Sequence, residues 1–221
     1  MQTEVPTAER RSLPRLNEPA PDFEATTTQG PLKLSDLRGK WVVLFSHPAD
    51  FTPVCSTEFM AFARNYDEFT KRNAVLVGIS VDSVYSHIAW IRNIEEKAGV
   101  KVPFPVVADL DMKVAQQFGM IHPGEGATAT VRTVFFIDDK GIVRAMIYYP
   151  MSCGRNIDEI VRVLDALQTA DKNGVATPAN WRPGDDVVVP APATQEAAEK
   201  RMGEQGLKQV DWYLSTKPLP R

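Results

Sequence analysis

Three segments in the first half of the chain indicate its fold. They are WVVLFS at residues 41–46, STEFMAFARNYDEFTKRN at residues 56–73 and AVLVGISVD at residues 74–82. The first and last of these segments are short apolar runs containing β-branched residues, a pattern typical of strands buried on both faces. The middle segment has aromatic residues at helical spacing, namely Phe59, Phe62, Tyr66 and Phe69. Because a strand, a helix and a second strand follow in this order, the sequence predicts an α/β layered domain.

The same alternation continues along the chain. Ser83 predicts the N-cap of a helix that runs to about Lys97, and Gly99 is suited to end it. The next elements are expected to be a strand at residues 104–109, a short helix at 112–118, a hairpin over 133–149 and a helix at 156–168. We therefore expect the α/β domain to cover residues 1–173, beginning with an extended, proline-containing segment at residues 1–19.

Residues 174–221 differ in character from the rest of the chain. This region is rich in proline, but Trp181 and the three valines at residues 187–189 make it too apolar for a free linker. We expect it to form an arm that packs on another surface, with one short helix near residues 195–205. The chain thus predicts one α/β domain followed by a C-terminal extension.

The composition argues against several classes of protein. Of the 221 residues, 43% are hydrophobic and 24% charged, as in globular chains, and a net charge of −3 gives no basic footprint for nucleic acid. The apolar runs are far too short to span a membrane. Because two cysteines cannot form a disulfide scaffold, we expect a reducing, cytoplasmic compartment.

The sequence gives no reason to expect a metal or a cofactor. The two cysteines and three histidines show no zinc-ligand spacing, and the chain has no glycine-rich nucleotide loop. His87 and His122 have no partner at ligand spacing. We therefore expect both to be ordinary packing or surface histidines.

The segment SHPADFTPVCSTE, residues 46–58, lies between a predicted strand and a predicted helix. Cys55 falls in the first turn of that helix, where free backbone N–H groups and the helix dipole stabilise a thiolate. This placement makes Cys55 a candidate nucleophile, although a lone cysteine is more often buried and inert. Pro48 rigidifies the loop, and the hydroxyl of Thr52 can turn toward the same pocket as both donor and acceptor.

The spacing of Pro48, Thr52 and Cys55 resembles the active-site loop of the peroxiredoxins, which are thiol peroxidases of the AhpC/TSA family. Further segments resemble the one-cysteine, peroxiredoxin-6-like subfamily, namely VRTVFFID around Arg132, YYP…GRN at 148–156 and WRPGDD at 181–186. The resemblance covers nearly the whole chain. It implies a thioredoxin-like fold with a C-terminal arm that joins dimers.

The resemblance also implies roles for individual residues. Cys55 would be the peroxidatic cysteine, whose thiolate attacks a peroxide oxygen and becomes a sulfenic acid. Arg132 would stabilise the thiolate and the charge on the leaving oxygen. Thr52 and the Cys55 N–H would orient the peroxide, and Pro48 would shield the thiolate.

Three further residues are expected to support this group. His47 would lie near the cysteine and tune it, the alternative being a histidine at a strand end that is bonded to backbone. Glu58 and Arg155 resemble family residues that hold the arginine and the loop. Some members of the subfamily have a lipase activity from a serine just before the first strand, but Lys40 stands at that position here.

The second thiol, Cys153, has two interpretations. It could resolve the sulfenic acid, or it could be a bystander in a loop, and we favour the second. No cysteine follows it in residues 154–221, so we expect an external thiol reductant of the thioredoxin, glutaredoxin or glutathione type. The resemblance further implies a homodimer or a decameric ring of five dimers.

The sequence therefore predicts a thiol-dependent peroxidase that reduces hydrogen peroxide and organic hydroperoxides through Cys55. A redox-controlled chaperone or peroxide sensor would share the rapid oxidation of Cys55 but would not turn over with a thiol. A thioredoxin-like disulfide reductase is disfavoured because Cys55 has no partner at the Cys-x-x-Cys spacing.

Overall fold

The computed structural model describes residues 13–219 of the chain, so part of the expected N-terminal segment lies outside the described residues. The chain divides into two compact units, Met1–Ile157 and Asp158–Arg221. The last long helix is therefore grouped with the C-terminal region, whereas the sequence suggested a boundary after residue 173. Within the described residues, no helix is both long and apolar enough to cross a membrane.

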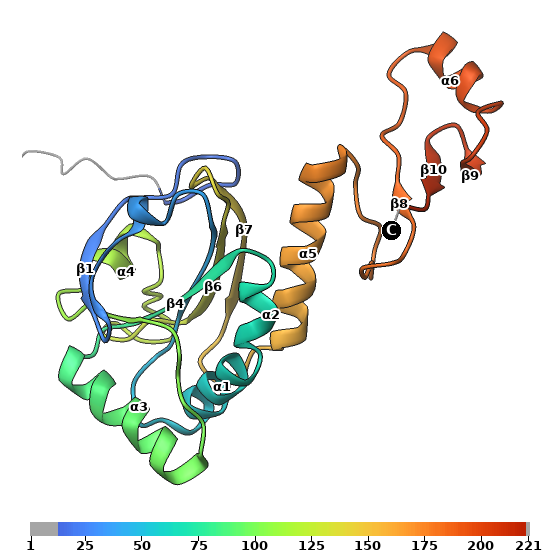
Figure 1. Cartoon of the computed structure of the whole chain (residues 1–221). Helices are drawn as coiled ribbons and strands as arrows, with labels where there is room; N and C mark the ends of the chain where they lie inside the picture. The colour runs from blue at the N-terminus through green and yellow to red at the C-terminus, as the bar shows by residue number, and fades with distance from the viewer. Residues whose placement is uncertain (1–12, 220–221) are drawn as a thin grey trace, which may run out of the picture. The chain divides into compact units, whose positions relative to one another are not determined.

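The first unit is built on a seven-stranded mixed sheet in the order β2-β1-β5-β4-β3-β6-β7 (Figure 1). Its strands are β1 (Glu24–Thr27), β2 (Gly30–Lys33), β3 (Trp41–Ser46), β4 (Ala74–Ser80), β5 (Val106–Ala108), β6 (Arg132–Ile137) and β7 (Val143–Tyr149). The central strands β3, β4 and β5 are parallel, and β6 runs antiparallel to β3. The expected strand at 41–46 and the hairpin over 133–149 are confirmed, and the architecture is the α/β fold that the sequence predicted.

Four α-helices and one 3-10 helix complete the part of the first unit that the structure describes. They are η1 (Leu34–Leu37), α1 (Pro53–Arg64), α2 (Tyr66–Thr70), α3 (Val84–Ala98) and α4 (Lys113–Gln117). The predicted signals of α3 are confirmed, since the Ser83 side chain accepts from the N–H of Ser86 and Gly99 ends the helix at a φ of 66°.

The two faces of β3 pack against different partners because successive side chains of a strand point to opposite sides. Val42 and Leu44 belong to a core that includes Phe118, just after α4. On the other face, the Phe45 ring stacks on Phe62 of α1 with centroids 4.1 Å apart. Strand β3 is buried along its whole length in the middle of the sheet, so α1 and the loop before it follow a rigid element.

Several elements differ from the prediction. The expected helix over residues 56–73 begins earlier, at Pro53, and is interrupted at Asn65, so that it forms α1 and α2. Proline is favoured at the first position of a helix because its missing N–H costs no intrahelical bond there. The short strands β1 and β2 were not expected, because Gly30 and Pro31 masked their weak strand pattern.

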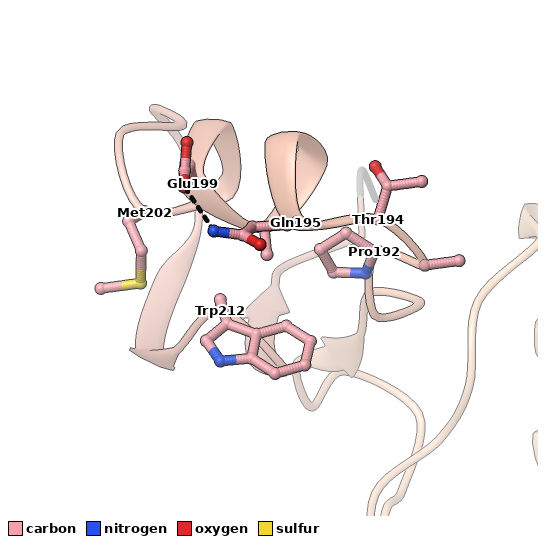
Figure 2. Close-up of a pocket in the computed structure, with 8 residues that line it drawn as sticks. Pro192, Thr194, Gln195, Glu199, Met202 and Trp212 are labelled. Atoms are coloured by element: carbon pink, nitrogen blue, oxygen red, sulfur yellow. Dashed lines mark hydrogen bonds between the residues drawn. The ribbon is translucent and has the colours of Figure 1, made fainter.

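The second unit contains α5 (Ile157–Asn173), β8 (Val187–Val188), α6 (Gln195–Arg201), β9 (Lys208–Asp211) and β10 (Leu214–Lys217). Its three strands form a small antiparallel sheet in the order β8-β10-β9. The predicted short helix is confirmed as α6, whose first turn is capped by the Thr194 side chain. Figure 2 shows a shallow pocket between α6 and Trp212, lined also by Pro192 and Met202.

Candidate active site

The loop between β3 and α1 presents Cys55 at the start of a helix. Cys55 is the third residue of α1, and the first bond of that helix runs from the N–H of Ser56 to the carbonyl of Thr52. The N–H groups of Val54 and Cys55 therefore precede the intrahelical ladder and carry the positive end of the dipole. Phe51 has a positive φ of 56°, which a bulky residue rarely adopts, so the backbone turns sharply just before this helix.

The side chain of Cys55 is fully buried and lies against Arg132. The Nη1–H of Arg132 donates to Cys55 Sγ over 3.3 Å. Arg132 begins β6, the strand that pairs with β3, and its Nε and Nη2 both donate to the carbonyl of Met151, at 2.9 and 2.7 Å. This fork fixes the guanidinium plane in contact with the sulfur.

Glu58 joins two buried arginines one helical turn after Cys55. Its Oε2 accepts from Arg132 Nη1 at 2.8 Å and from Arg155 Nη2 at 2.6 Å, while Oε1 accepts from the Nε and backbone N–H of Arg155. Burial alone would raise the pKa of Glu58, but the charge and hydrogen bonds of Arg155, with the charge of Arg132, outweigh it and hold that pKa below its ordinary value. Glu58 is therefore an anion between two cations.

Arg155 ties this group to the central sheet. Its Nη1 donates to the carbonyls of Ser46 and Thr133 at 2.9 Å each, and its guanidinium lies 5.2 Å from the centre of the Phe45 ring. Glu58 thus contacts Arg132 directly, and Arg155 contacts it through Glu58, while their supporting role stays a prediction.

The two remaining loop residues lie close by. The Thr52 hydroxyl donates to the carbonyl of Ala49 at 2.9 Å, so its oxygen still has lone pairs that can accept a hydrogen bond. Thr52 is half-buried, while Pro48 is buried. The structure gives no direct contact from the Thr52 hydroxyl to Cys55, so its orienting role stays a prediction.

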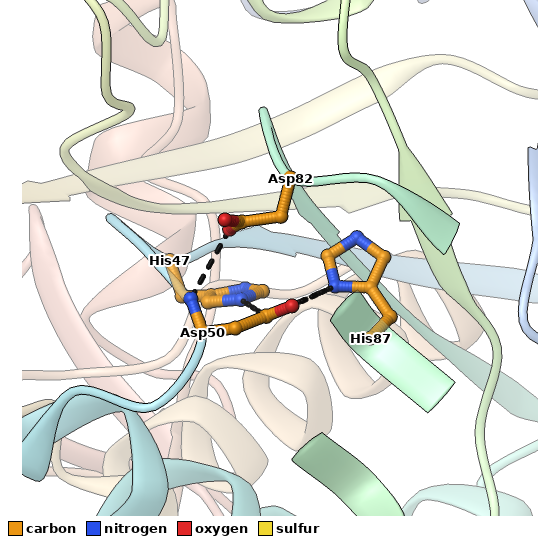
Figure 3. A group of neighbouring side chains, drawn as sticks. All are labelled: His47, Asp50, Asp82 and His87. Carbon is orange, nitrogen blue, oxygen red and sulfur yellow. Dashed lines mark hydrogen bonds and ion pairs between the residues drawn. The ribbon is translucent and has the colours of Figure 1, made fainter. Parts of the chain in front are cut away.

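A second, largely buried polar group includes the loop residues His47 and Asp50 (Figure 3). His47 Nε2 is 3.0 Å from Asp50 Oδ1, and His87 Nδ1 is 2.9 Å from both oxygens of the same carboxylate. Asp82 Oδ2 accepts from the backbone N–H of Asp50. Together these four residues are close enough to suit a divalent cation, but the imidazole nitrogens that face Asp50 are already engaged with it, and we describe them as a hydrogen-bonded network.

The network bears on two expectations. His87 is fully buried and bonded through both ring nitrogens, so of the two kinds of histidine considered it is a packing and not a surface histidine, and its partner Asp50 is distant in the sequence. The ring of His47 bonds to Asp50 and not to backbone, contrary to the alternative considered for it. Burial outweighs the attraction of Asp50 and lowers the pKa of His47 below 6.5.

Cys153 lies in the segment that also supplies the carbonyl bonded to Arg132. Both cysteines are free thiols, and Cys153 is exposed while Cys55 is buried. The neighbouring Gly154 packs against the start of α1, since a Cβ at this glycine would lie 3.4 Å from Val54 Cγ1. Cys153 is therefore nearer to the active-site loop than its sequence position suggests.

A glutamine at position 58 is expected to lower the free energy of unfolding by about 3–5 kcal/mol, because it leaves two buried guanidinium groups without their anion. The folded-state pKa of Glu58 lies below its unfolded value, so its stabilising effect is complete above the unfolded pKa and is lost as the pH falls through the folded one. The difference between the two proteins should therefore be constant from about pH 6 to 8.

Urea unfolding of Glu58→Gln and wild type at equal protein concentration measures this difference. Glu159→Gln is the matched control, because Glu159 pairs with Arg162 on a partly exposed helix face. Its effect should stay within about 1 kcal/mol, the range of exposed ion pairs. Equal losses in the two variants would show that the Glu58 group is no more than an ordinary ion pair.

The comparisons with known proteins agree with this geometry. The AhpC/TSA family matches residues 16–146, and the C-terminal domain of 1-Cys peroxiredoxin matches residues 166–205. A peroxiredoxin of Aquifex aeolicus is 59% identical over 219 residues, which cover 94% of this chain and 98% of that protein. The chain belongs to the peroxiredoxins of the AhpC/TSA family. It is a thiol-dependent peroxidase, and the resemblance found in its sequence is confirmed.

Two solved structures match most of the chain. A yeast mitochondrial 1-Cys peroxiredoxin, described in connection with thiol resolution via glutathione and thioredoxin systems, has a TM-score of 0.83 and 44% identity, covering 93% of this chain and 99% of its own. A mutant of peroxiredoxin 6 from Arenicola marina has a TM-score of 0.83 and 38% identity, covering 94% and 99%. The thioredoxin-like fold with a C-terminal extension is therefore confirmed.

Sequence reasoning missed three polar contributors near this peroxidase's reactive loop. The contact between Asp50 and His87 was missed because 37 residues separate them, and only the packing of α3 beside the loop brings them together. The carbonyl of Met151 carries no side-chain signal at all. The one available hint was that a buried strand is followed immediately by His47 and, three residues later, by an acidic residue.

Proposed function

We propose that Cys55 is the thiol oxidised by peroxide and that Arg132 is its main electrostatic partner. The proposal rests on a surplus of buried positive charge. The guanidinium groups of Arg132 and Arg155 share the single carboxylate of Glu58, and Arg132 also donates to the Cys55 sulfur. A thiolate at Cys55 would balance this surplus, and the N-terminal dipole of α1 favours the same charge. The group therefore favours the nucleophilic form of the cysteine.

In the proposed reaction the Cys55 thiolate attacks one peroxide oxygen. The S–O bond forms as the O–O bond breaks, the sulfur loses two electrons, and the leaving oxygen departs as water or an alcohol after taking up a proton. Of the five N–H donors of Arg132, four are used by Met151, Glu58 and the sulfur, which leaves one Nη2–H for the leaving oxygen.

The loop residues are proposed to complete the substrate site. Because the Thr52 hydroxyl proton is directed to Ala49, the Thr52 oxygen can accept a hydrogen bond from the peroxide O–H. The Cys55 N–H can donate to the same substrate, Pro48 shields the thiolate from water, and His47 tunes the cysteine from the buried side of the loop. These roles follow the expectations from the sequence.

Reduction of the sulfenic acid is proposed to use an external thiol. One thiol condenses with the sulfenic acid to give a mixed disulfide and water, and a second thiol restores Cys55 and leaves as a disulfide. The similarity to a yeast 1-Cys peroxiredoxin described with glutathione and thioredoxin systems supports a donor of the thioredoxin, glutaredoxin or glutathione class. A reducing cytoplasmic location suits such a donor.

Cys153→Ser is expected to leave peroxide turnover with a small thiol within about twofold of the wild type. The reason is that an exposed thiol outside the Cys55–Arg132 contact takes no part in the proposed cycle. Steady-state peroxide consumption with dithiothreitol measures turnover, and non-reducing electrophoresis after peroxide treatment detects any linked chains. Loss of turnover together with loss of a peroxide-induced disulfide would assign the resolving role to Cys153.

The second unit is proposed to join two copies of the chain. Its exposed surface includes large apolar side chains that a monomer seldom leaves in water, namely Met202, Val210, Trp212 and Tyr213. The match to a 1-Cys peroxiredoxin C-terminal domain falls on the same unit. Sedimentation velocity over a range of concentrations distinguishes a homodimer from a ring of five dimers, and a monomer at all concentrations would refute the proposal.

A further inference from the structure

His87 is a buried histidine that the reaction described above does not use. It lies on α3 with no exposed surface, between the carboxylate of Asp50 and the backbone carbonyl of Val107. Its Nδ1 is 2.9 Å from both Asp50 oxygens, and its Nε2 is 3.1 Å from the Val107 oxygen. Both ring nitrogens therefore face oxygen atoms at hydrogen-bond distance.

These contacts place an oxygen acceptor beside each nitrogen of the His87 ring. A carbonyl oxygen can only accept a hydrogen bond, so Nε2 must carry a proton. A carboxylate can also only accept, so Nδ1 must carry one too. Asp50 is ionised: burial would raise its pKa, but hydrogen bonds from His47 and His87 outweigh burial and hold the pKa far below its ordinary value. An imidazole that donates from both nitrogens is a cation, so this geometry favours an ion pair between His87 and Asp50.

The pair leaves His47 in the opposite state. The Nε2 of His47 is 3.0 Å from the Asp50 carboxylate, so that nitrogen carries the proton. Burial lowers the pKa of this ring below 6.5 despite Asp50, so His47 is neutral and its Nδ1 has a lone pair. Among the residues that the structure describes, this buried Nδ1 has no hydrogen-bond partner. His47 is thus a neutral histidine in one tautomer, held directly before the Cys55 loop.

Few charged groups other than Asp50 and His87 lie around the His47 ring and could affect its protonation. The ring of His47 packs between Phe59 of α1 and Trp90 of α3, with centroids 4.7 and 5.1 Å away, and neither is charged. The charged groups that act on it are Asp50, Asp82 and His87. Asp82 Oδ2 accepts from the Ser80 hydroxyl and from the N–H of Asp50, so its contacts hold the loop. Strand β5 contributes only the Val107 carbonyl.

We propose that His87 is a positioning residue that stays protonated and neutralises Asp50, so that His47 remains neutral with its Nδ1 lone pair free beside the reactive loop. Without the His87 cation, the buried Asp50 carboxylate would draw a proton onto His47, because that ring is its other hydrogen-bond partner. The inference rests on the proposed function only for its effect on Cys55. The charge states themselves are a property of the folded chain and can be tested without peroxide.

Nitrogen-15 NMR of the histidine rings in the reduced wild-type chain tests the charge states directly. We expect His87 to show two protonated nitrogens from about pH 6 to 8, and His47 to show one protonated and one bare nitrogen over the same range. A neutral His87, or a doubly protonated His47, would overturn the proposal. A change of these signals on treatment with a chelator would also overturn it, because a bound cation would then hold the group.

Two variants test the link between the rings. In His87→Gln, which removes the cation but keeps an amide donor for Asp50, we expect His47 to gain a protonation step between about pH 6 and 8. In Asp50→Asn we expect His87 to become neutral. His122→Gln is the matched control, because His122 is an exposed histidine that contacts the Gly119 carbonyl, and the His47 signals should not change. An unchanged His47 in folded His87→Gln would refute the coupling.

The oxidation rate separates this inference from the proposed role of Cys55. We expect the pH profile of the Cys55 oxidation rate in His87→Gln to gain an inflection at the pH where His47 takes up its proton, and Cys55 to remain the oxidised residue. If the pH profile of the Cys55 oxidation rate did not change although His47 is protonated, the charge of His47 would have no effect on the reaction of Cys55. If Cys55 were not oxidised even in the wild type, the proposed function would fail and the charge assignment would stand.

Discussion

Replacement of Cys55 by serine is expected to abolish peroxide consumption, to below about one part in a thousand of the wild-type rate. A serine hydroxyl has almost the same shape as the thiol, but its oxygen cannot take up a second oxygen and its alkoxide is not stabilised at neutral pH. The buried contact with Arg132 favours a negative charge at position 55, but only a sulfur at this position can be oxidised by peroxide. Peroxide depletion in the presence of dithiothreitol measures the loss.

Two controls accompany the serine variant. Circular dichroism and thermal unfolding should remain close to those of the wild type, because Cys55 is a small buried side chain and serine leaves no large cavity. Cys153→Ser, the matched removal of the other thiol, should keep its activity. Persistent turnover in a folded Cys55→Ser protein would mean that another group reacts with peroxide.

Arg132→Lys is expected to lower the second-order rate constant for Cys55 oxidation by at least about 100-fold, the range seen when a preorganised donor to developing charge is removed. Lysine keeps the positive charge, but a single ammonium cannot hold the Met151 carbonyl twice, bind Glu58 and reach the sulfur in one plane. Stopped-flow mixing with excess hydrogen peroxide, followed by loss of the reduced thiol, gives the rate constant.

Arg92→Lys provides the comparison for the arginine prediction, since Arg92 is exposed on α3 and its replacement should leave the rate within about twofold. A small loss in Arg132→Lys would show that positive charge alone activates the thiol. A loss of folding in that variant would be detected by circular dichroism, and Arg132→Gln, which keeps a planar side chain with two donors, would then provide the rate.

The parts of the fold that sequence reasoning predicted are those whose local signals agree with their packing. Strand β3 is apolar from Trp41 to Phe45 and is buried along its whole length, and Ser83 and Gly99 are residues that suit their ends of α3. The short strand Gly30–Lys33 could not be found in this way. It is half-exposed, and its strand geometry comes from pairing with β1 and not from its own composition.

The same distinction applies to the site. Cys55 could be named as a candidate nucleophile from a local feature, the first turn of a helix that follows a buried strand, and the family resemblance then favoured it over an inert cysteine. Arg132 and Glu58 meet across 74 residues and were placed only through the family resemblance. The charge of His87 depends on two oxygens from different elements, Asp50 and Val107, and no local pattern encodes such a pairing.

Mass spectrometry of both cysteines after one equivalent of hydrogen peroxide, with a sulfenic-acid trap and under non-reducing conditions, tests most directly whether Cys55 alone carries the oxidation. We predict that the trap is found on Cys55 and that Cys153 remains a free thiol. Oxidation of Cys153 with Cys55 still reduced would contradict the assignment of the reactive thiol, and a Cys55–Cys153 disulfide would contradict reduction by an external thiol.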